Sequence, residues 1–386
     1  MEVNKGMQDY LFDESGNGLQ NNYSFINRVV FYVSLMCNLN CKHCYVKGSL
    51  SNCQLSLADR FYIIDKILLL NKPIDITGGE PLLFDDLFEI IKRIFSGGGT
   101  VSSIFTNATL IEQKRDLVIE ILNMAGVINW FISLDGNIEA HDSFRGQGTF
   151  VKTVRGAEIL MNNNQNVLIN TMLHSAVNKE MLKNLYNIIK ENGYKRWRID
   201  SPFVSGSWTS NKGKYEVAYK KQIELLTYII HWWLNDDMPF EIEIGHVAKY
   251  IDNKLYFLDQ YDLNDPVCPC RSFPVWPDGN VSWCQDLSDS EYVIGNLFRD
   301  NLSDIYNRYV TYKTVSIKSI AEHNSKCYNC RYLRNCGTGC RMGAIGNGTG
   351  YYGVDTNLCM LYKEQLFLPI LNELKKYISV KLGDEI

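Results

Sequence analysis

The sequence lacks the features that mark secreted, membrane-spanning and nucleic-acid-binding proteins. Residues 1–27 have neither a basic start nor an apolar run, so no secretory signal is visible. The longest apolar stretch, residues 223–234, contains Glu224 and His231 and is too short and too polar to span a bilayer. The formal net charge of -4 gives no general attraction to nucleic acid or to anionic membranes. We therefore expect a cytoplasmic protein whose partners are small molecules or other proteins.

Length and periodicity predict an α/β fold. A chain of 386 residues with 46% hydrophobic content can build one large domain and an appended smaller one. Short β-rich apolar runs alternate with longer amphipathic segments from residue 29 to about residue 203. We place strands at 29–35, 74–77, 101–106, 127–134, 167–173 and 197–200, and helices at 57–70, 83–95, 114–123, 153–162 and 179–192. These units predict a partial (β/α)6 barrel of TIM type, with its ligand site at the carboxyl ends of the strands.

Three closely spaced cysteines follow the first predicted strand. Cys37, Cys41 and Cys44 have the spacing Cys-x3-Cys-x2-Cys, and three thiolates on one loop can hold three corners of an iron–sulfur cubane. No fourth cysteine lies near enough in sequence to close the cluster, so one iron is left open. Zinc, which usually takes two Cys-x2-Cys pairs, is the weaker alternative. The motif resembles the cluster loop of the radical S-adenosylmethionine (SAM) superfamily, and the resemblance implies that the open iron binds SAM, whose reductive cleavage yields a 5'-deoxyadenosyl radical.

Further motifs lie at the ends of the predicted strands, where the resemblance places SAM. The glycines of the run Gly78, Gly79, Glu80 and Pro81 let the backbone approach a ligand, and Glu80 can accept hydrogen bonds from an ammonium group. The other candidates for cofactor binding are Tyr45, Asn107, Ser133, Asp135 and Arg145. The resemblance implies that Tyr45 lies beside the adenine and that Arg145 meets the SAM carboxylate, while Ser133 and Asp135 suit ribose or carboxylate contacts. Ordinary turns, caps and a surface arginine are the alternative reading.

A second field of cysteines occupies the last third of the chain. Its eight members are Cys268, Cys270, Cys284, Cys327, Cys330, Cys336, Cys340 and Cys359, and strands at 272–276 and 281–284 flank a glycine turn among them. Their spacing closely resembles the SPASM extension of radical SAM peptide and protein maturases. The resemblance implies two auxiliary [4Fe-4S] clusters, hence three in total, with Cys268, Cys284 and Cys340 on the first and Cys327, Cys330, Cys336 and Cys359 on the second. Cys270 either completes the first cluster or leaves an open iron there, and we favour ligation. The twelfth cysteine, Cys53, reads as a spare thiol.

Changes in composition divide the chain into five predicted segments. They are an N-terminal arm (1–28), a radical SAM partial barrel (29–214), a helical linker (215–265), a SPASM auxiliary-cluster domain (266–360) and a C-terminal helix (361–386). We expect the last segment, which is amphipathic, to pack on the main domain, with Pro369 able to kink it. The arm has no room for the fused winged-helix leader-peptide binder, roughly eighty residues, that some peptide maturases carry. Such a binder would be a separate chain.

The resemblance covers about residues 29–360 and implies an oxidoreductase. Such an enzyme cleaves SAM with an electron from a flavodoxin- or ferredoxin-type protein. It then abstracts a hydrogen atom from a ribosomally made precursor peptide to install a cross-link, an epimer or another modification. The alternatives are a maturase of a tetrapyrrole or other small-molecule cofactor and, in a different class, a non-catalytic iron–sulfur electron carrier, which would need no SAM pocket.

One departure from the family pattern argues against sulfatase maturation. Sulfatase maturases carry an aspartate directly after the cysteine that follows the glycine hairpin. Here Gln285 takes that place and Asp286 comes one residue later. Because adjacent residues of a strand point to opposite faces, we expect Asp286 not to replace that aspartate.

Overall fold

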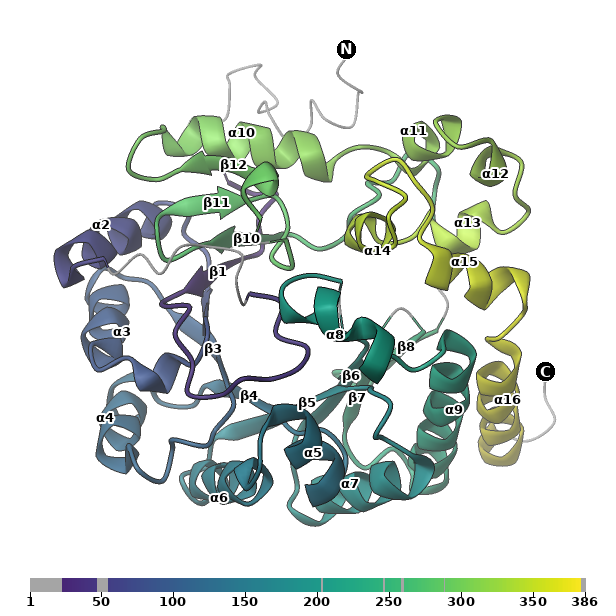
Figure 1. The fold of residues 1–386 in the computed structure, drawn as a ribbon, viewed down its shortest axis with the longest axis horizontal. Helices are drawn as coiled ribbons and strands as arrows, with labels where there is room; N and C mark the ends of the chain where they lie inside the picture. Colours follow the sequence, from purple (N-terminus) through teal and green to yellow (C-terminus); the bar gives the residue numbers. More distant parts are fainter. Residues whose placement is uncertain are drawn as a thin grey trace.

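One twelve-stranded sheet organises the protein. The structure is a computed structural model of the 386-residue chain, and it describes residues 23–46, 55–202, 204–245, 247–257, 260–287 and 289–382. The strands lie in the order β12-β11-β10-β1-β2-β3-β4-β5-β6-β7-β8-β9. Neighbouring strands from β1 to β7 run parallel, and the sheet curves so that helices form an outer ring around it (Figure 1). The α/β fold with a curved parallel sheet confirms the predicted class.

The parallel strands are short and mostly buried. Their bounds are β1 (Arg28–Tyr32), β2 (Ile74–Thr77), β3 (Val101–Thr106), β4 (Asn129–Ser133), β5 (Asn166–Met172), β6 (Arg196–Asp200) and β7 (Glu241–Ile244). The predictions for β2 and β3 coincide with the structure, whereas β1 ends three residues before its predicted end. This early end leaves residues 33–36 free to form the loop that leads to Cys37.

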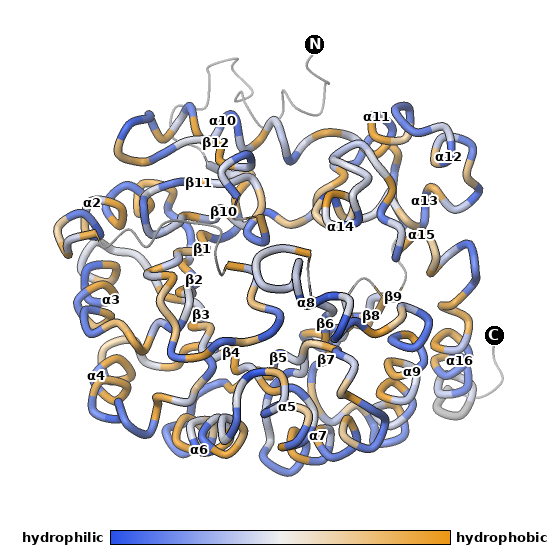
Figure 2. The backbone as a smooth tube through the Cα atoms, in the orientation of Figure 1, coloured by the Kyte–Doolittle hydropathy of each residue, from blue (hydrophilic) through white to orange (hydrophobic). Residues whose placement is uncertain are grey.

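The outer helices bury one apolar face each. They are α2 (Leu57–Leu68), α3 (Leu87–Ser96), α4 (Arg115–Ala125), α6 (Thr149–Asn162), α7 (Lys179–Glu191) and α9 (Tyr219–Asn235). In α3 the buried residues are Leu87, Ile90, Ile91 and Ile94, which is the spacing of one helix face. Figure 2 shows polar residues along the outside of this ring. The hydrophobic effect therefore holds the helices against the sheet.

The segment predicted to be a helical linker is helical only in its first half. It begins with the end of α8 and with α9, but residues 241–257 form β7, β8 (Ala248–Ile251) and β9 (Lys254–Phe257), which extend the main sheet. The sequence of β7, Glu-Ile-Glu-Ile, alternates polar and apolar residues with the period of a strand, and this signal outweighs the helical neighbourhood. Before residue 215, two helices were also not predicted, α5 (Ile138–Arg145) and α8 (Ser207–Tyr215).

The cysteine-rich part of the chain is joined to the barrel through the sheet. Strand β10 (Ser272–Val275) pairs in parallel with β1, and β11 (Asn280–Ser282) and β12 (Val293–Asn296) follow antiparallel, which confirms the predicted hairpin. Five short helices lie beyond α10 (Leu302–Lys313): α11 (Ile317–Glu322), α12 (Ser325–Tyr328), α13 (Leu333–Cys336), α14 (Arg341–Gly346) and α15 (Thr356–Lys363).

The C-terminal helix packs on the main domain, as predicted. Helix α16 (Leu368–Leu382) lies along α9 (Figure 1). Pro369 is the second residue of α16, where proline is tolerated, so it does not kink the helix interior. Within the described residues, no helix combines the length and apolar character that a membrane span requires. Most of the predicted N-terminal arm, and Cys53, lie outside the described residues.

Candidate functional site

The loop with Cys37, Cys41 and Cys44 follows β1 at the carboxyl ends of the parallel strands, and α8 holds one side of it. The Ser207 backbone N–H donates to the Cys44 carbonyl oxygen at 2.8 Å, and Asn211 Nδ2 donates to the Lys42 carbonyl oxygen at 3.0 Å. Gly206 precedes the helix with φ 53°, and a Cβ there would lie 2.4 Å from the Cys44 oxygen. Only glycine permits this approach. The polar sequence of α8 has little apolar periodicity, which is why sequence reasoning missed it.

Asn107 anchors the other side of the same loop. Its Nδ2 donates to Asn38 Oδ1 at 2.9 Å and lies 3.8 Å from Cys37 Sγ, and its Oδ1 accepts from the backbone N–H and the hydroxyl of Thr109. The Leu39 backbone N–H also points at Cys37 Sγ, at 3.4 Å. We predicted Asn107 as a cofactor contact, and the structure places its amide group on the cluster loop itself. Donors aimed at a sulfur stabilise a thiolate, so these contacts favour a ligand role for Cys37.

Gly78 and Gly79 lie against the start of the cluster loop. The N–H of Gly79 donates to the Ser34 oxygen and that of Glu80 to the Met36 oxygen, both at 2.8 Å. A Cβ on Gly78 would lie 2.2 Å from the Ser34 oxygen, and one on Gly79 would lie 2.1 Å from the Met36 oxygen. The structure thus gives both glycines a packing role that the sequence did not indicate, while a contact with SAM stays a prediction.

The buried Glu80 carboxylate ties this turn to the end of β3. It accepts hydrogen bonds from the Leu82 N–H at 3.0 Å, the Thr106 hydroxyl at 2.7 Å and the Asn107 N–H at 2.7 Å. Burial raises the pKa of Glu80 to about 7, although these three donors act in the opposite direction. Pro81 follows and begins the short 3-10 helix η1 (Pro81–Leu83). Glu80 is therefore a structural link of the rim as well as a candidate for ammonium binding.

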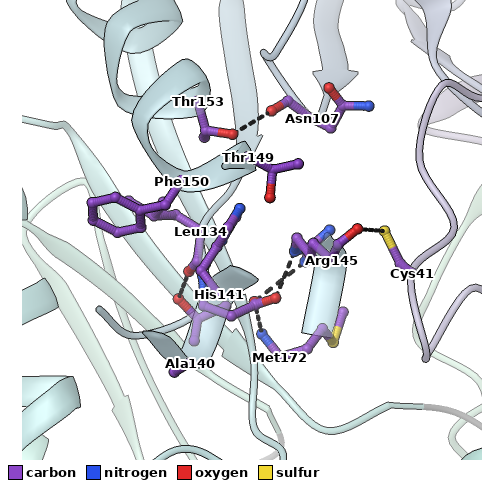
Figure 3. A network of polar contacts seen from close by, with 12 residues as sticks. Cys41, Asn107, Leu134, Ala140, His141, Arg145, Thr149, Phe150, Thr153 and Met172 are labelled. Atoms are coloured by element: carbon purple, nitrogen blue, oxygen red, sulfur yellow. Dashed lines mark hydrogen bonds and ion pairs between the residues drawn. The ribbon is translucent and has the colours of Figure 1, made fainter. Parts of the chain in front are cut away.

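Asp135 and Arg145 form a buried ion pair beside the cluster loop. Arg145 Nε donates to Asp135 Oδ2 at 2.5 Å, its second nitrogen lies 3.2 Å from Oδ1, and the Met172 N–H donates to the same carboxylate at 2.8 Å. Burial raises the pKa of Asp135, but the Arg145 guanidinium more than offsets this and holds the pKa well below its usual range. Figure 3 shows Arg145 next to Cys41, whose Sγ lies 4.0 Å from the Arg145 carbonyl oxygen.

This ion pair bears more on the ribose or carboxylate contact expected for Asp135 than on the SAM-carboxylate contact expected for Arg145. The Asp135 carboxylate is occupied by protein donors, so its direct role is to orient the arginine. Arg145 lies at the end of α5 and faces the loop, where a SAM carboxylate is predicted. Ser133 ends β4 and is paired with Asn170 of β5 in the sheet.

Three buried histidines surround the ion pair, and the sequence gave no sign of this cluster. The rings of His43 and His174 stack on Phe144 with centroids 4.8 and 3.8 Å away. His141 Nδ1 accepts from the Asp135 N–H at 3.2 Å. Burial, as the largest cause, lowers the pKa of His43 to about 3 and those of His141 and His174 to about 4. All three rings are therefore neutral at pH 7.

An aromatic bridge connects the cluster loop to the cysteine-rich region. Tyr45, which follows Cys44, shares a 2.8 Å hydrogen bond between its hydroxyl and that of Tyr32. Tyr32 also donates to the Gln285 carbonyl oxygen at 2.8 Å, and its ring stacks on Trp276 at 4.0 Å. Through these contacts the end of β1, the third cysteine of the loop and the hairpin β10–β11 form one packed unit.

The structure gathers four of the SPASM cysteines into a first thiol group. This group comprises Cys268, Cys270, Cys284 and Cys340. Burial raises the pKa of Cys268, and the neighbouring Cys270 and Cys340 raise it further. Burial likewise holds the pKa of Cys284 well above its usual value, with Cys268 and Cys340 adding to the effect. Cys270 thus lies with the three predicted ligands of the first auxiliary cluster, as we expected if it ligates.

The other four cysteines form a second thiol group, which comprises Cys327, Cys330, Cys336 and Cys359. Burial raises the pKa of Cys327, and Cys359 and Cys330 contribute in the same direction. Burial raises the pKa of Cys336 to about 11, with further contributions from the other three thiols of the group. The interleaved assignment of these two groups to two clusters stays a prediction from the resemblance.

The donor set fits iron–sulfur clusters better than zinc. All eleven described cysteines are free thiols. Over the described ranges, no three His, Cys, Asp or Glu side chains converge closely enough to hold a single metal ion. Thiols that are near one another but do not converge on a point suit a multi-atom cluster. Burial raises the pKa of Cys37, Cys268 and Cys336, so metal binding would displace protons from these three thiols.

The expectation for Asp286 was wrong. β11 ends at Ser282 and residues 285–286 form a turn, so the alternation of a strand does not apply to them. The Gln285 side chain accepts from the Ser272 hydroxyl at 2.8 Å and points back to β10. Asp286 lies near Arg198, and its charge raises the pKa of Tyr45. It therefore faces the space between the cluster loop and the first thiol group, and the argument against sulfatase maturation does not hold.

A pocket of about 680 Å³ opens beside the cluster loop. Its walls come from the loop itself, from the segment after β3, and from the end of α5 with the start of α6. Arg145 and Phe144 are among its lining residues, so the pocket reaches the ion pair and the stacked rings described above.

Comparison with known proteins agrees with both cysteine fields. The Radical SAM superfamily model matches residues 31–189, and the SPASM model, an iron-sulfur cluster-binding domain, matches residues 267–331. Curated relatives include the AdoMet-dependent heme synthase of Oleidesulfovibrio alaskensis (25% identical, covering 81% of this chain and 82% of the relative) and the cysteine-type anaerobic sulfatase-maturating enzyme of Clostridium novyi (24%; 79% and 85%). The antilisterial bacteriocin subtilosin biosynthesis protein AlbA of Bacillus subtilis is 24% identical over 87% of this chain and 71% of its own.

Solved structures share the fold. The anSMEcpe structure with bound AdoMet and Cp18Cys peptide has a TM-score of 0.68 at 20% identity and covers 92% of this chain and 99% of its own. Streptococcus suis SuiB bound to precursor peptide SuiA has a TM-score of 0.64 at 17% identity and covers 88% and 76%. The likeness to these structures concerns the fold, whereas the two matched models show that the chain carries a radical SAM domain followed by a SPASM domain, and in this organisation it resembles the maturases.

Proposed function

We propose that this enzyme reductively cleaves SAM and uses the resulting radical to abstract a hydrogen atom from a ribosomally made precursor peptide, leaving a cross-link, an epimer or another modification. Three [4Fe-4S] clusters serve this chemistry, one on Cys37, Cys41 and Cys44 and one on each thiol group. The observation that carries the proposal is that the Tyr32 hydroxyl hydrogen-bonds to both regions, to Tyr45 of the cluster loop and to the Gln285 carbonyl oxygen of the SPASM region. A substrate bound at the barrel mouth would meet both regions.

Within this site each described residue has a stated task. When bound, the cluster and SAM supply the 5'-deoxyadenosyl radical. Arg145, held by Asp135, offers a guanidinium to the SAM carboxylate, and Glu80 with the neighbouring backbone offers acceptors to its ammonium group. The contacts of Asn107 and α8 keep the loop in place.

We place β7 in the barrel because it continues the parallel sheet from β6. We begin the SPASM domain at residue 266.

The charged mouth of the barrel supports a peptide substrate. Arg198 pairs with Asp200, the last residue of β6, at 2.8 Å. Asp200, then Glu243 and Asp286, raise the pKa of Arg198, which places it among three carboxylates. Such a surface suits the amides and polar side chains of a peptide better than a large apolar macrocycle. The relatives AlbA and SuiB, named for a bacteriocin and a bound precursor peptide, support the same class.

A maturase of a tetrapyrrole or other small-molecule cofactor is the second candidate. The heme synthase of Oleidesulfovibrio alaskensis, similar over most of both chains, favours it. The gene neighbourhood separates the two: a short open reading frame supports a peptide, and haem-biosynthesis genes support the tetrapyrrole.

A direct test compares both substrates under anaerobic conditions. Reconstituted enzyme is reduced and supplied with SAM and either the neighbouring precursor peptide or an iron porphyrin, and 5'-deoxyadenosine and the substrate are followed by mass spectrometry. We expect SAM cleavage and a modified peptide. The triple variant Cys37→Ala, Cys41→Ala, Cys44→Ala is the matched control and abolishes both. A modified porphyrin with an untouched peptide would establish the second candidate, and no SAM cleavage at full iron content would contradict both.

A further inference from the structure

Lys313 is a completely buried cation at the first thiol group. It is the last residue of α10, its side chain has no exposed surface, and its Nζ lies 3.1 Å from Cys268 Sγ. The rings of Tyr309 and Trp283 lie 5.5 and 5.9 Å from the ammonium group and complete its surroundings. A lysine is almost never fully buried unless an opposite charge compensates it.

The compensating charge of Lys313 comes from sulfur. Arg145, another buried cation, forms an ion pair with the Asp135 carboxylate. The buried Arg341 donates hydrogen bonds to the carbonyl oxygens of Tyr351 and Gly353. For Lys313 no carboxylate oxygen of the described residues lies within ion-pair distance. Its Nζ contacts Cys268 Sγ instead, so a thiolate at Cys268, as in a bound cluster, would compensate its charge.

The second thiol group has no equivalent partner. No lysine or arginine nitrogen in the described part of the chain donates to the sulfur of Cys327, Cys330, Cys336 or Cys359. The Arg341 guanidinium, which lies nearby, is used by backbone carbonyl oxygens. The two groups therefore differ by one buried positive charge in direct contact with a sulfur.

We propose that Lys313 raises the reduction potential of the cluster on the first thiol group above that of the cluster on the second. Reduction adds one negative charge to a cluster, and a fixed cation at hydrogen-bond distance in a low-dielectric interior stabilises that charge. An electron that enters the SPASM domain then resides first on the cluster beside Lys313, which is also the one nearer to Asp286 and Tyr45. The inference rests on the proposed function for the assignment of the cysteines to clusters.

The experiment isolates the auxiliary clusters and measures their potentials. The triple variant Cys37→Ala, Cys41→Ala, Cys44→Ala is reconstituted to about eight iron atoms and titrated anaerobically while the reduced clusters are followed by electron paramagnetic resonance. Two midpoint potentials are expected, and the signal of the higher one is lost in Cys268→Ala. Adding Lys313→Met to the triple variant should lower the higher midpoint potential by at least about 59 mV, which is a tenfold change in the one-electron equilibrium. The lower midpoint potential should not change.

Two further variants show whether charge is the cause. Lys313→Arg keeps a cation and retains most of the higher potential. Lys318→Met, which removes an exposed lysine of α11 that pairs with Glu322, changes neither potential. If Lys313→Met loses its cluster, Lys313→Arg decides: a retained cluster with the higher midpoint supports the proposal, and a lost one contradicts it.

The failures of the two proposals are distinguishable. An iron content near zero in the triple variant contradicts the cysteine assignment itself. Full iron content contradicts the role of Lys313 alone if Lys313→Met leaves the higher midpoint unmoved, if it shifts both midpoints equally, or if the higher midpoint belongs to the second thiol group.

Discussion

The cluster loop and the two thiol groups present sulfur ligands in opposite ways. Cys37, Cys41 and Cys44 lie within eight residues on one loop, and elements of the folded barrel, among them α8 and the end of β3, hold that loop. The SPASM cysteines are distributed from residue 268 to residue 359, and those of the second group lie on or beside helices of four to eight residues. We therefore expect the barrel to present its site before a cluster binds, and the SPASM region to depend on metal for its assembly.

The apolar cores of the two regions support this difference. The main core runs through the barrel strands and their outer helices, contains most of the buried residues and continues into the SPASM region, where Leu358 and Leu361 of α15 belong to it. The satellite core beneath the second thiol group has six buried members, Val267, Ile317, Ile320, Ala321, Cys327 and Leu333. A core of that size rarely stabilises a fold alone, and natural domains of this kind use metals or disulfides in addition. One of its six members is itself a cysteine predicted to ligate.

The largest expected effect follows from removing iron. In the iron-free protein we expect backbone amides of residues 317–336, which form α11 to α13, to lose their hydrogen-exchange protection, while β1 to β6 stay protected, because the metal supplies folding free energy only where the core is small. The triple variant Cys37→Ala, Cys41→Ala, Cys44→Ala, with its auxiliary clusters in place, should keep protection in both regions. Equal loss across the barrel and the SPASM region would contradict the comparison.

The next effect concerns a barrel residue that should behave independently of metal. Arg145→Ala leaves the Asp135 carboxylate buried without its cation, and breaking a buried pair in this way costs about 3–5 kcal/mol. The barrel should unfold at lower urea concentration, with or without iron. Arg155→Ala is the matched control, since Arg155 forms exposed ion pairs with Glu112 and Glu158, which solvent screens, and its loss should cost far less. Similar costs for the two variants would show that the pair does not support the rim.

Sequence periodicity predicted the barrel well because its strands and helices bury regular faces. All six predicted parallel strands are present, since alternation and apolar runs record burial directly. The same reasoning failed where burial is not periodic. Helix α8 buries only Trp208, and the linker prediction extended a helical pattern past residue 240 into β7 to β9.

The candidate site was predicted in its residue types but not in its contacts. The spacing of the cysteines identified the thiols. The ion pair between Asp135 and Arg145, however, depends on α5, which no local sequence pattern predicted. The orientation of Asp286 depends on where β11 ends, and a sequence shows such ends least clearly. Lys313 was not singled out at all, because a lysine at the end of a helix usually reads as a solvent-exposed group.

The pH dependence of stability sharpens the comparison at the barrel rim. The pKa of Glu80 is raised from 4.5 to about 7, so the folded protein binds more protons than the unfolded one between these values, and stability falls as the pH rises through this window. At 1.36 kcal/mol per pH unit, the wild type should lose about 3 kcal/mol relative to Glu80→Gln between pH 4.5 and 7. Urea unfolding of both proteins across this range measures the difference. A constant difference would mean that folding does not shift the pKa of Glu80.

The smallest effect tests whether α8 holds the loop in advance of the cluster. Gly206→Ala forces a side chain into the left-handed region and against the Cys44 oxygen, at a cost of about 1–2 kcal/mol. Gly213→Ala, in the same helix, meets open space and should stabilise the protein by up to about 1 kcal/mol. Thermal unfolding ranks the two variants, and the resonance signal of the SAM-responsive cluster reports the loop. Of these two glycines only Gly206 contacts the loop, so the signal should change in Gly206→Ala and not in Gly213→Ala. A change in both variants would mean that α8 acts through its general stability and that this contact does not preform the site.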